Sequence, residues 1–554
     1  MPDAYAESAI DVALNLKTQP YSRNIFGHFI EHFHTQVYGG IFDSASDLSD
    51  AKGYRVDVIE AMREMRPPVV RWPGGCFVSS YHWLDGVGPD RRSHYDKAWR
   101  VCDPNTFGTR EFVEWCEAIG AAPYICTNAG TGSAEEMSDW LEYCNLPNGS
   151  RWADLRSAHG SSDPLAVPFW SIGNENYGHW EIGAKTPDEW SSVVRESAKM
   201  MRRVDESVTL LAAARSDLEW TLPMLLNAGD YLDLVSIHGY WDRLSQVNEP
   251  SSYLTAIGQS LAPQEEIQRT ASIIGATGLA SKVGIAFDEW NLRGWHHPDG
   301  TSTTAIQARD KNDDNSTYTM ADALFSASFL NSCLRKSDIV RMANIAPSVN
   351  TRGPLFVHRD GVVRRPTFHV MSMYSSLLGS DVVETSGSSR GLEGTGVPAI
   401  DVLATTDPAR TRLNLALINR DPARSVSCHA RVQGHSISGT YEATILQGGS
   451  SDSFNDVRHP SAVVPQQAKA VFSDGQTTLP PHSLTICDID LPFRYSDGIV
   501  DGVSGQGRAW DLSSNGWART TGSSRWAPHH PSVGLLTDDL PCPAAIGPPM
   551  LDNG

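Results

Sequence analysis

The feature that most constrains this sequence is an alternation between short apolar runs and longer segments with helical periodicity. Helical spacing is clear in residues 109–120, where Phe112, Trp115, Cys116 and Ile119 share one face. Because strands that alternate with helices form parallel sheets, the pattern predicts an α/β fold. Eight apolar or β-branched runs predict the strands, at residues 25–29, 69–72, 122–127, 167–172, 208–214, 234–237, 283–287 and 339–344.

Eight such units within residues 21–380 match a (β/α)8 barrel. The alternative is an open, doubly wound parallel sheet. Proteins of that type often bind phosphates through a Gly-rich loop that directly follows a strand, and no such loop follows any of the eight runs. The barrel is therefore the favoured architecture.

The rest of the chain has a different sequence pattern. Residues 381–495 contain short β-type runs separated by Gly, Pro, Ser and Asp, which predicts an antiparallel, jelly-roll-like β-sandwich. The N-terminal segment, residues 1–20, contains one strand-like run that we expect to join this sandwich. Residues 496–554 are rich in Gly, Ser, Pro and Asp, and we expect them to form a disordered tail.

Composition limits the partners and the compartment. The net charge of −20 would repel nucleic acid, and no run approaches the length of a membrane-spanning helix. The nine cysteines show no zinc-site spacing and suggest reduced thiols. The first residues lack the basic and apolar regions of a secretory signal, so we expect a cytoplasmic location.

Two glutamates stand at the ends of predicted strands, where a (β/α)8 barrel places its active site. Glu175 follows the fourth strand and Glu289 follows the seventh. Hydrolysis of a glycosidic bond needs such a pair, because one carboxylic acid protonates the leaving oxygen while the other attacks or stabilises the anomeric carbon. A second Asn-Glu pair, at residues 248–249, lacks a preceding apolar run and is interpreted as a surface loop.

Other polar residues lie near the same strand ends. Glu31 has three histidines close to it in sequence, but alternate residues of a strand point to opposite faces, so we expect no metal site there. Cys76 would need a lowered thiol pKa and a partner histidine to act as a nucleophile, and a pocket-lining role is the favoured interpretation. No cofactor is required. The remaining residues of this kind are His32, Arg71, Asn128, Asn174, His238, Tyr240, Asp288, Asn344 and Asn350.

Several segments together resemble the α-L-arabinofuranosidases of glycoside hydrolase family 51. The resemblance runs in order from about residue 20 to about residue 490. It implies a barrel with a C-terminal β-sandwich, retaining exo-hydrolysis of terminal arabinofuranosyl residues from arabinan- or arabinoxylan-derived oligosaccharides, and a homo-oligomer, often a hexamer. The segments are GHFIEHFHTQVYGGIFD, RWPGGCFVSSYHWLDGVGP, WSIGNENYGHW, SIHGYW, FDEWN and VNTRGPLFVHRDGVVRRPTFHVMSMY.

By this resemblance, Glu175 is the general acid/base and Glu289 is the nucleophile. The resemblance also implies substrate-binding roles for six residues: Asn174 at the sugar 2-hydroxyl, Glu31 and Cys76 at other hydroxyls, Trp99 near the leaving group, His238 in the pocket, and Tyr240 on the nucleophile.

One position departs from the family pattern. Pro347 stands where many members have a glutamine that contacts arabinose, and Asn350 or Arg352 is the candidate to replace that contact. A related retaining endo-β-glucanase or β-xylosidase on the same barrel remains an alternative. A non-catalytic sugar-binding protein is a further alternative, against which the presence of both glutamates argues.

Overall fold

The computed structural model describes residues 7–14, 18–242, 250–294 and 313–491. The expected tail at residues 496–554 and the Asn-Glu pair at residues 248–249 lie outside the described residues. Among the helices in the described ranges, none combines the length and the apolarity needed to cross a membrane.

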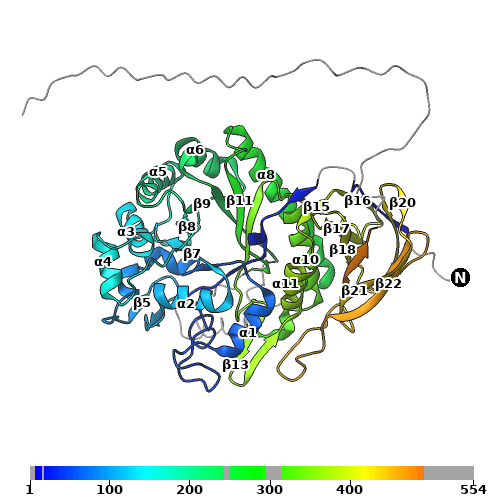
Figure 1. The fold of residues 1–554 in the computed structure, drawn as a ribbon, viewed down its shortest axis with the longest axis horizontal. Helices are drawn as coiled ribbons and strands as arrows, with labels where there is room; N and C mark the ends of the chain where they lie inside the picture. The colour runs from blue at the N-terminus through cyan, green and yellow to red at the C-terminus, as the bar shows by residue number, and fades with distance from the viewer. Residues whose placement is uncertain (1–6, 15–17, 243–249, 295–312, 492–554) are drawn as a thin grey trace, which may run out of the picture. The chain divides into compact units, whose positions relative to one another are not determined.

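Eight parallel strands close into a barrel, which confirms the predicted fold class (Figure 1). Each strand pairs with the next one in the chain, and the last strand pairs with the first through Asn344 with Gly27 and Ile345 with His28. In chain order the strands are β3 (Gly27–Phe29), β4 (Val69–Trp72), β7 (Ala122–Thr127), β8 (Phe169–Ile172), β9 (Thr209–Ala213), β10 (Leu234–Asp242), β11 (Gly284–Arg293) and β12 (Val340–Ile345).

Some strand boundaries differ from the sequence prediction for local reasons. Residues 25–26 belong to the short helix η1 (Arg23–Phe26), which is capped by the Ser22 hydroxyl. The predicted fourth strand starts two residues late because the backbone of Val167 bonds to the Asn145 side chain instead of to a neighbouring strand. In contrast, β10 and β11 continue beyond their predicted ends, so the candidate residues on them lie within strands rather than after them.

Helices surround the barrel, and their ends follow the capping signals in the sequence. Helix α5 begins at Pro187 because the Thr186 side chain and Glu189 form a reciprocal capping box. Helix α2 buries Phe112, Trp115, Cys116 and Ile119, the face that the sequence predicts. The helices are α1 (Val56–Met65), α2 (Thr109–Ile119), α3 (Ala134–Asn145), α4 (Arg151–Ala158), α5 (Pro187–Val204), α6 (Leu218–Ala228), α7 (Tyr253–Gly258), α8 (Ala262–Ala276), α10 (Met320–Arg335) and α11 (Pro366–Leu377).

Two further sheets pack face to face around a separate apolar core. In β18, Leu413, Leu415 and Leu417 alternate inward and meet Ile10 and Val12 of β1. The smaller sheet has β1 (Glu7–Val12), β16 (Thr385–Ser388), β19 (Val426–Val432), β20 (His435–Ser436) and β23 (Gln476–Leu479). The larger has β2 (Gln19–Pro20), β15 (Asp381–Val383), β17 (Ile400–Thr406), β18 (Arg412–Asn419), β21 (Gly439–Gln447), β22 (Gln466–Phe472) and β24 (Ser483–Asp490).

Most pairings in these sheets are antiparallel, although β1 lies parallel to β19. Because β1 and β2 both pair with strands from the C-terminal part, we propose that residues 1–20 and 381–495 form one β domain and residues 21–380 form the barrel domain.

Helix α10 links the two parts of the fold. Its sequence has almost no charged residues, and its side chains from Met320 to Leu334 are buried. One side packs on the barrel, and the Ser328 hydroxyl accepts hydrogen bonds from Arg420, which also pairs with Asp401 of β17. Figure 1 shows α10 and α11 between the barrel and the sheets. An all-round apolar helix is the expected solution at such a position.

Candidate active site

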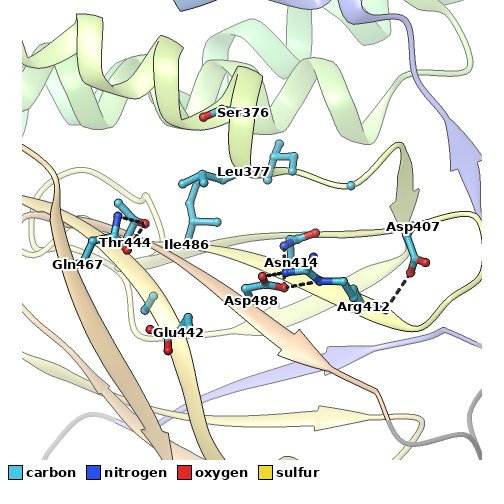
Figure 2. Close-up of a pocket in the computed structure, with 13 residues that line it drawn as sticks. Ser376, Leu377, Asp407, Arg412, Asn414, Glu442, Thr444, Gln467, Ile486 and Asp488 are labelled. Atoms are coloured by element: carbon cyan, nitrogen blue, oxygen red, sulfur yellow. Dashed lines mark hydrogen bonds and ion pairs between the residues drawn. The ribbon is translucent and has the colours of Figure 1, made fainter. Parts of the chain in front are cut away.

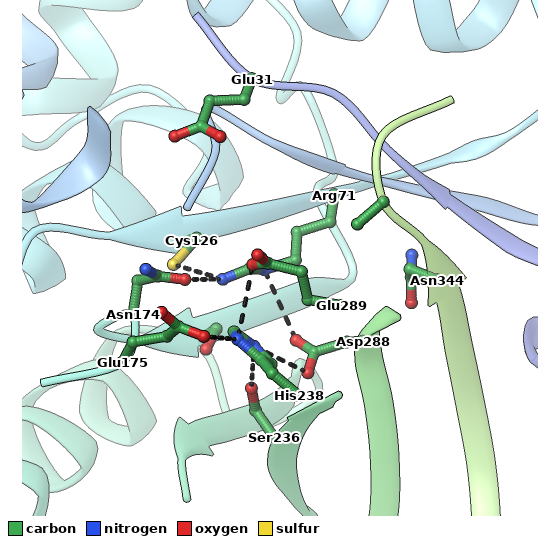
Figure 3. A network of polar contacts seen from close by, with 12 residues as sticks. Glu31, Arg71, Cys126, Asn174, Glu175, Ser236, His238, Asp288, Glu289 and Asn344 are labelled. Carbon is green, nitrogen blue, oxygen red and sulfur yellow. Dashed lines mark hydrogen bonds and ion pairs between the residues drawn. The ribbon is translucent and has the colours of Figure 1, made fainter. Parts of the chain in front are cut away.

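The candidate site lies at the C-terminal ends of the barrel strands, where β8, β10 and β11 bring three charged side chains together (Figure 3). In the parallel pairing of β10 with β11, His238 stands directly opposite Glu289. The register shifts between Ser236 and His238 and again between Phe287 and Trp290, which re-aims the residues that follow. Glu175 approaches from the turn after β8.

Glu289 is held by two strong donors. Its Oε2 accepts a hydrogen bond from Arg71 Nη1 at 2.8 Å, and its Oε1 accepts one from the Tyr240 hydroxyl at 2.6 Å. Arg71 also donates to Asn174 Oδ1 at 2.7 Å, so it links the two halves of the site. A carboxylate gripped at both oxygens has little freedom to rotate, as a nucleophile requires.

The buried carboxylate of Asp288 supports this arrangement. Asp288 is fully buried, and its Oδ2 accepts a hydrogen bond from the Tyr124 hydroxyl at 2.6 Å. Arg71 and His238 lie within 3.6 Å of its oxygens. Burial raises the pKa of Asp288, but these two cations overcome that effect and hold it below its ordinary value.

Glu175 sits in a strained turn and is surrounded by donors. Its backbone φ of 43° lies in the left-handed region, and Gly178 N closes the turn on its carbonyl at 2.7 Å. His238 Nδ1 lies 2.9 Å from Glu175 Oε1, which the Tyr177 hydroxyl also contacts at 3.3 Å. Trp180 Nε1 donates to Oε2 at 3.1 Å. The turn therefore aims the carboxyl toward Glu289.

Glu175 and His238 share a proton. Burial lowers the pKa of His238, but the charges of Glu289, Asp288 and Glu175 outweigh this and raise it to about 10. Burial raises the pKa of Glu175, yet the His238 imidazolium holds it below its ordinary value. At neutral pH the pair therefore carries one proton that can move across a 2.9 Å contact.

The two carboxyl groups lie close together. One oxygen of Glu175, one of Glu289 and a ring nitrogen of His238 are all within 4.8 Å of one another. Retaining glycosidases separate their carboxyls by about 5–5.5 Å, whereas inverting enzymes need about 6.5–9.5 Å to fit a water molecule. The spacing fits direct attack by one carboxylate.

Glu31 faces the same space from the segment that follows β3. Its Oε1 accepts hydrogen bonds from Phe77 N at 3.1 Å and from Trp99 Nε1 at 2.9 Å. Burial, together with the charge of Glu289, raises the pKa of Glu31 to about 8. A Cβ atom on Gly75 would lie 3.4 Å from oxygens of both Glu31 and Glu289, so glycine keeps the space between these carboxylates open.

The remaining predicted residues border this space or support it. Asn174 Nδ2 is buried and has no hydrogen-bond partner within the described residues, which leaves a donor for a ligand hydroxyl. The Cys76 thiol lies beside Glu175, and burial raises its pKa well above the ordinary value, so it is a neutral donor rather than a nucleophile. Trp99 is buried against Glu31 and Phe33.

The structure also separates the two candidates for the missing glutamine contact. Asn350 is committed to backbone, since its Nδ2 donates to Thr35 O at 2.6 Å and its Oδ1 accepts from Val357 N at 2.7 Å. The Arg352 guanidinium instead lies 4.3 Å from the centre of the ring of Tyr240, the residue that donates to Glu289. Arg352 Nε also donates to Ala346 O at 3.2 Å, directly before Pro347, so Arg352 is the better placed of the two candidates.

The histidines near Glu31 do not gather around it. His28 Nδ1 bonds to Ser348 Oγ at 2.8 Å, and His32 Nδ1 bonds to Asp103 Oδ2 at 2.8 Å. Within the part of the chain that the structure describes, two other groups are compact enough for a metal ion, Cys76 with Glu175 and Glu181, and Glu175 with His238 and Glu289. Both groups include Glu175, whose oxygens already accept three hydrogen bonds, so we assign them to the polar network.

Sequence reasoning missed part of this site. The sequence shows Arg71 and Asp288 as polar residues near strand ends, but no pattern in it indicates that the two side chains form an ion pair. Tyr177, Trp180 and Glu181 follow Glu175 within six positions, and only that proximity could have flagged them.

A second hollow lies away from the barrel mouth, against β18, β21 and β24 (Figure 2). Its volume is about 410 Å³, and an ion pair between Arg412 and Asp488 crosses it. None of its lining residues is aromatic, so it offers no ring to stack on a sugar face. Because the barrel mouth holds the paired carboxylates, it is the candidate active site.

A closed (β/α)8 barrel with two neighbouring carboxyl groups at its C-terminal end is the arrangement typical of a glycoside hydrolase. Comparison with known proteins narrows this class. Residues 61–256 match the family model "Alpha-L-arabinofuranosidase 1 domain", and residues 288–483 match "Alpha-L-arabinofuranosidase C-terminal domain".

Individual relatives agree. The chain is 34% identical to α-L-arabinofuranosidase C of Emericella nidulans, over 67% of this chain and 75% of that protein. It is 35% identical to an intracellular exo-α-(1→5)-L-arabinofuranosidase of Halalkalibacterium halodurans, over 66% and 75% of the two chains. The crystal structure of an arabinose complex of the Thermotoga maritima α-L-arabinofuranosidase has a TM-score of 0.79 and 31% identity, over 87% and 100%. The chain belongs to the α-L-arabinofuranosidases of glycoside hydrolase family 51.

Proposed function

We propose that this chain is a retaining, exo-acting α-L-arabinofuranosidase, with Glu289 as nucleophile and Glu175 as general acid/base. The observation that carries the proposal is the approach of the two carboxyl groups to within 4.8 Å, with His238 between them. Substrate binding is proposed for Glu31, Cys76, Trp99, Asn174, His238 and Tyr240.

In the first step, a Glu289 oxygen attacks the anomeric carbon of the arabinofuranosyl unit. The bond from that carbon to the leaving oxygen breaks, and the leaving oxygen takes a proton from Glu175. Glu175 draws this proton from its pair with His238, across the 2.9 Å contact. The product is an ester between the sugar and Glu289.

In the second step, Glu175 acts as a base. It has given up its proton, and formation of the ester has removed the charge of Glu289, so a carboxylate is available to accept a proton from water. The water oxygen attacks the anomeric carbon and releases Glu289. The proton returns to the pair formed by Glu175 and His238, and two inversions give net retention.

Family membership and the enclosed donors support a terminal arabinofuranosyl residue as the group that is transferred. Asn174 Nδ2, the Cys76 thiol and the Glu31 carboxyl offer polar contacts for the hydroxyls of one sugar. The substrates proposed are arabinan- and arabinoxylan-derived oligosaccharides.

We also propose a cytoplasmic location and assembly into a homo-oligomer, with the hexamer as the candidate form. The eight cysteines within the described residues are all free thiols, and the Halalkalibacterium halodurans relative is named intracellular. Light scattering of the purified protein tests the assembly, and a mass equal to one chain would contradict it.

The experiment that tests the function is hydrolysis of 4-nitrophenyl α-L-arabinofuranoside beside the β-D-xyloside and the β-D-glucoside. The proposal predicts turnover of the arabinofuranoside, and release of arabinose from the non-reducing ends of arabino-oligosaccharides. Turnover of only the xyloside or glucoside would keep the barrel chemistry but reassign the substrate. Binding of arabinose without turnover of any substrate would indicate a sugar-binding protein.

A further inference from the structure

A third acidic side chain lies beside Glu175 and has no part in the two-step reaction. Glu181 is only 4% exposed, and the Ser79 hydroxyl donates to its Oε1 at 2.5 Å. A carboxyl group this deeply buried next to a catalytic acid needs a physical explanation, because burial disfavours its charge.

The turn that presents Glu175 also fixes Glu181. Gly178 N bonds to the Glu175 carbonyl at 2.7 Å, and Glu181 N bonds to the Gly178 carbonyl at 3.0 Å. Trp180, which directly precedes Glu181, donates a hydrogen bond from its indole to Glu175 Oε2. Both carboxyl groups are therefore set by one short segment.

Cys76 stands between the two carboxyls. Its sulfur, one oxygen of Glu175 and one oxygen of Glu181 lie within 4.8 Å of one another. The thiol is protonated, and Glu181 Oε2 is buried without a hydrogen-bond partner among the described residues, so the thiol can serve as a donor to this carboxyl. Glu181 thus offers an acceptor to a residue that lines the proposed sugar pocket.

Glu175 consequently has an imidazolium on one side and an acid on the other. The groups that face it from the packed elements are Cys76 after β4, Tyr177 and Glu181 in its own turn, His238 on β10 and Glu289 on β11. Glu31 adds a further acid across the pocket. Three arginines also lie near these groups. Arg71 is paired with Glu289 and Asp288, Arg352 stacks on Tyr240, and Arg215 lies over the Tyr177 ring.

Resting on the proposed function, we propose that Glu181 is a positioning residue of the acid/base side. It holds the Cys76 thiol toward the sugar, and its charge opposes that of His238, drawing the shared proton onto Glu175 where the leaving oxygen can take it. Burial raises the pKa of Glu181 to about 7, against the hydrogen bond from Ser79, so this charge develops in the neutral range.

The test is the pH profile of Glu181→Gln measured on two substrates. The amide oxygen can still accept from Ser79 and Cys76, but the charge is gone. A nearby anion increases proton affinity, so its removal should move the alkaline limb of kcat/KM to lower pH by about one unit. On that limb, kcat/KM on an arabino-oligosaccharide should fall by up to about 10-fold, the change that a one-unit shift produces. The loss on 4-nitrophenyl α-L-arabinofuranoside should be smaller, because its leaving group needs little protonation.

The matched control is Glu142→Gln, a half-buried carboxyl on α3 that accepts a hydrogen bond from Trp152 N. It should keep the wild-type profile on both substrates. Cys76→Ala should raise KM without moving the alkaline limb, which separates the thiol contact from the charge effect.

Several outcomes would overturn the inference. Superimposable profiles for Glu181→Gln and wild type would show that Glu181 does not act on Glu175. An equal loss at every pH and on both substrates, with a lowered Tm, would assign Glu181 a structural role only. If wild type itself hydrolyses neither substrate, the proposed function fails and the inference fails with it, which distinguishes this result from the first two.

Discussion

The two carboxyls proposed to be catalytic are held in different ways. Glu289 lies within a regular strand and is fixed by Arg71 and Tyr240 at 2.8 and 2.6 Å. Glu175 lies in a turn with a left-handed backbone and is contacted by His238, a group that itself titrates.

The difference follows from what each group must do. A nucleophile has one task and needs a fixed position and a constant charge, which a guanidinium and a hydroxyl provide. An acid/base must lose and regain a proton in each cycle, so a partner that can hold that proton is more suitable than a permanent cation. The strand side is thus built for rigidity and the turn side for proton exchange.

The largest expected effect comes from the rigid side. Glu289→Ala removes the attacking oxygen, and we expect kcat on 4-nitrophenyl α-L-arabinofuranoside to fall by at least about 10⁴-fold. Glu117→Ala, an exposed change on α2, is the control and should retain full activity. A Glu289→Ala protein with more than about one hundredth of wild-type activity would assign the nucleophile elsewhere.

The turn side should respond differently to the same truncation. Glu175→Ala is expected to reduce turnover of arabino-oligosaccharides by about 10²–10⁴-fold, and to affect aryl substrates with good leaving groups much less in the first step. Added azide should restore turnover by replacing the water that Glu175 activates, with a retained arabinosyl azide as product. Equal losses on both substrates without azide rescue would break the distinction between the two sides.

His238→Gln tests whether His238 holds the proton that it shares with Glu175. Without the imidazolium, burial raises the pKa of Glu175, so the base becomes ionised only at higher pH. The acidic limb of kcat should therefore move upward, and kcat at neutral pH should fall about 10²-fold. A pH profile that keeps its wild-type shape would show that His238 only fills space.

The smallest expected effect concerns the departure at Pro347. Arg352 stacks on Tyr240, and a cation–π contact of about 0.5–2 kcal/mol predicts a loss of about 2–30-fold in kcat/KM for Arg352→Gln. Arg352→Lys should recover part of it. If Arg352→Gln matches wild type, the site needs no replacement for the glutamine found in relatives.

The barrel and its two catalytic candidates could be predicted from sequence because both depend on local patterns. Apolar runs mark the strands, and Glu175 and Glu289 each follow such a run directly. The jelly-roll-like part could be recognised by its change of periodicity, although the parallel pairing of β1 with β19 depends on contacts between distant segments.

The supporting network was beyond prediction because it is set by strand register and not by sequence spacing. The bulges in β10 and β11 place His238 beside Glu289 and Asp288 below it, and no pattern in a single strand announces them. Likewise, Glu181 follows Glu175 by six residues, and only the folded turn places the two around Cys76.

The most direct test of the account is to trap the glycosyl-enzyme. Incubation with a 2-deoxy-2-fluoro-α-L-arabinofuranosyl substrate that carries a good leaving group, followed by proteolysis and tandem mass spectrometry, locates the labelled residue. The account predicts one sugar per active chain, attached as an ester to Glu289. A label on any other residue, or turnover that releases the inverted sugar without any adduct, would contradict it.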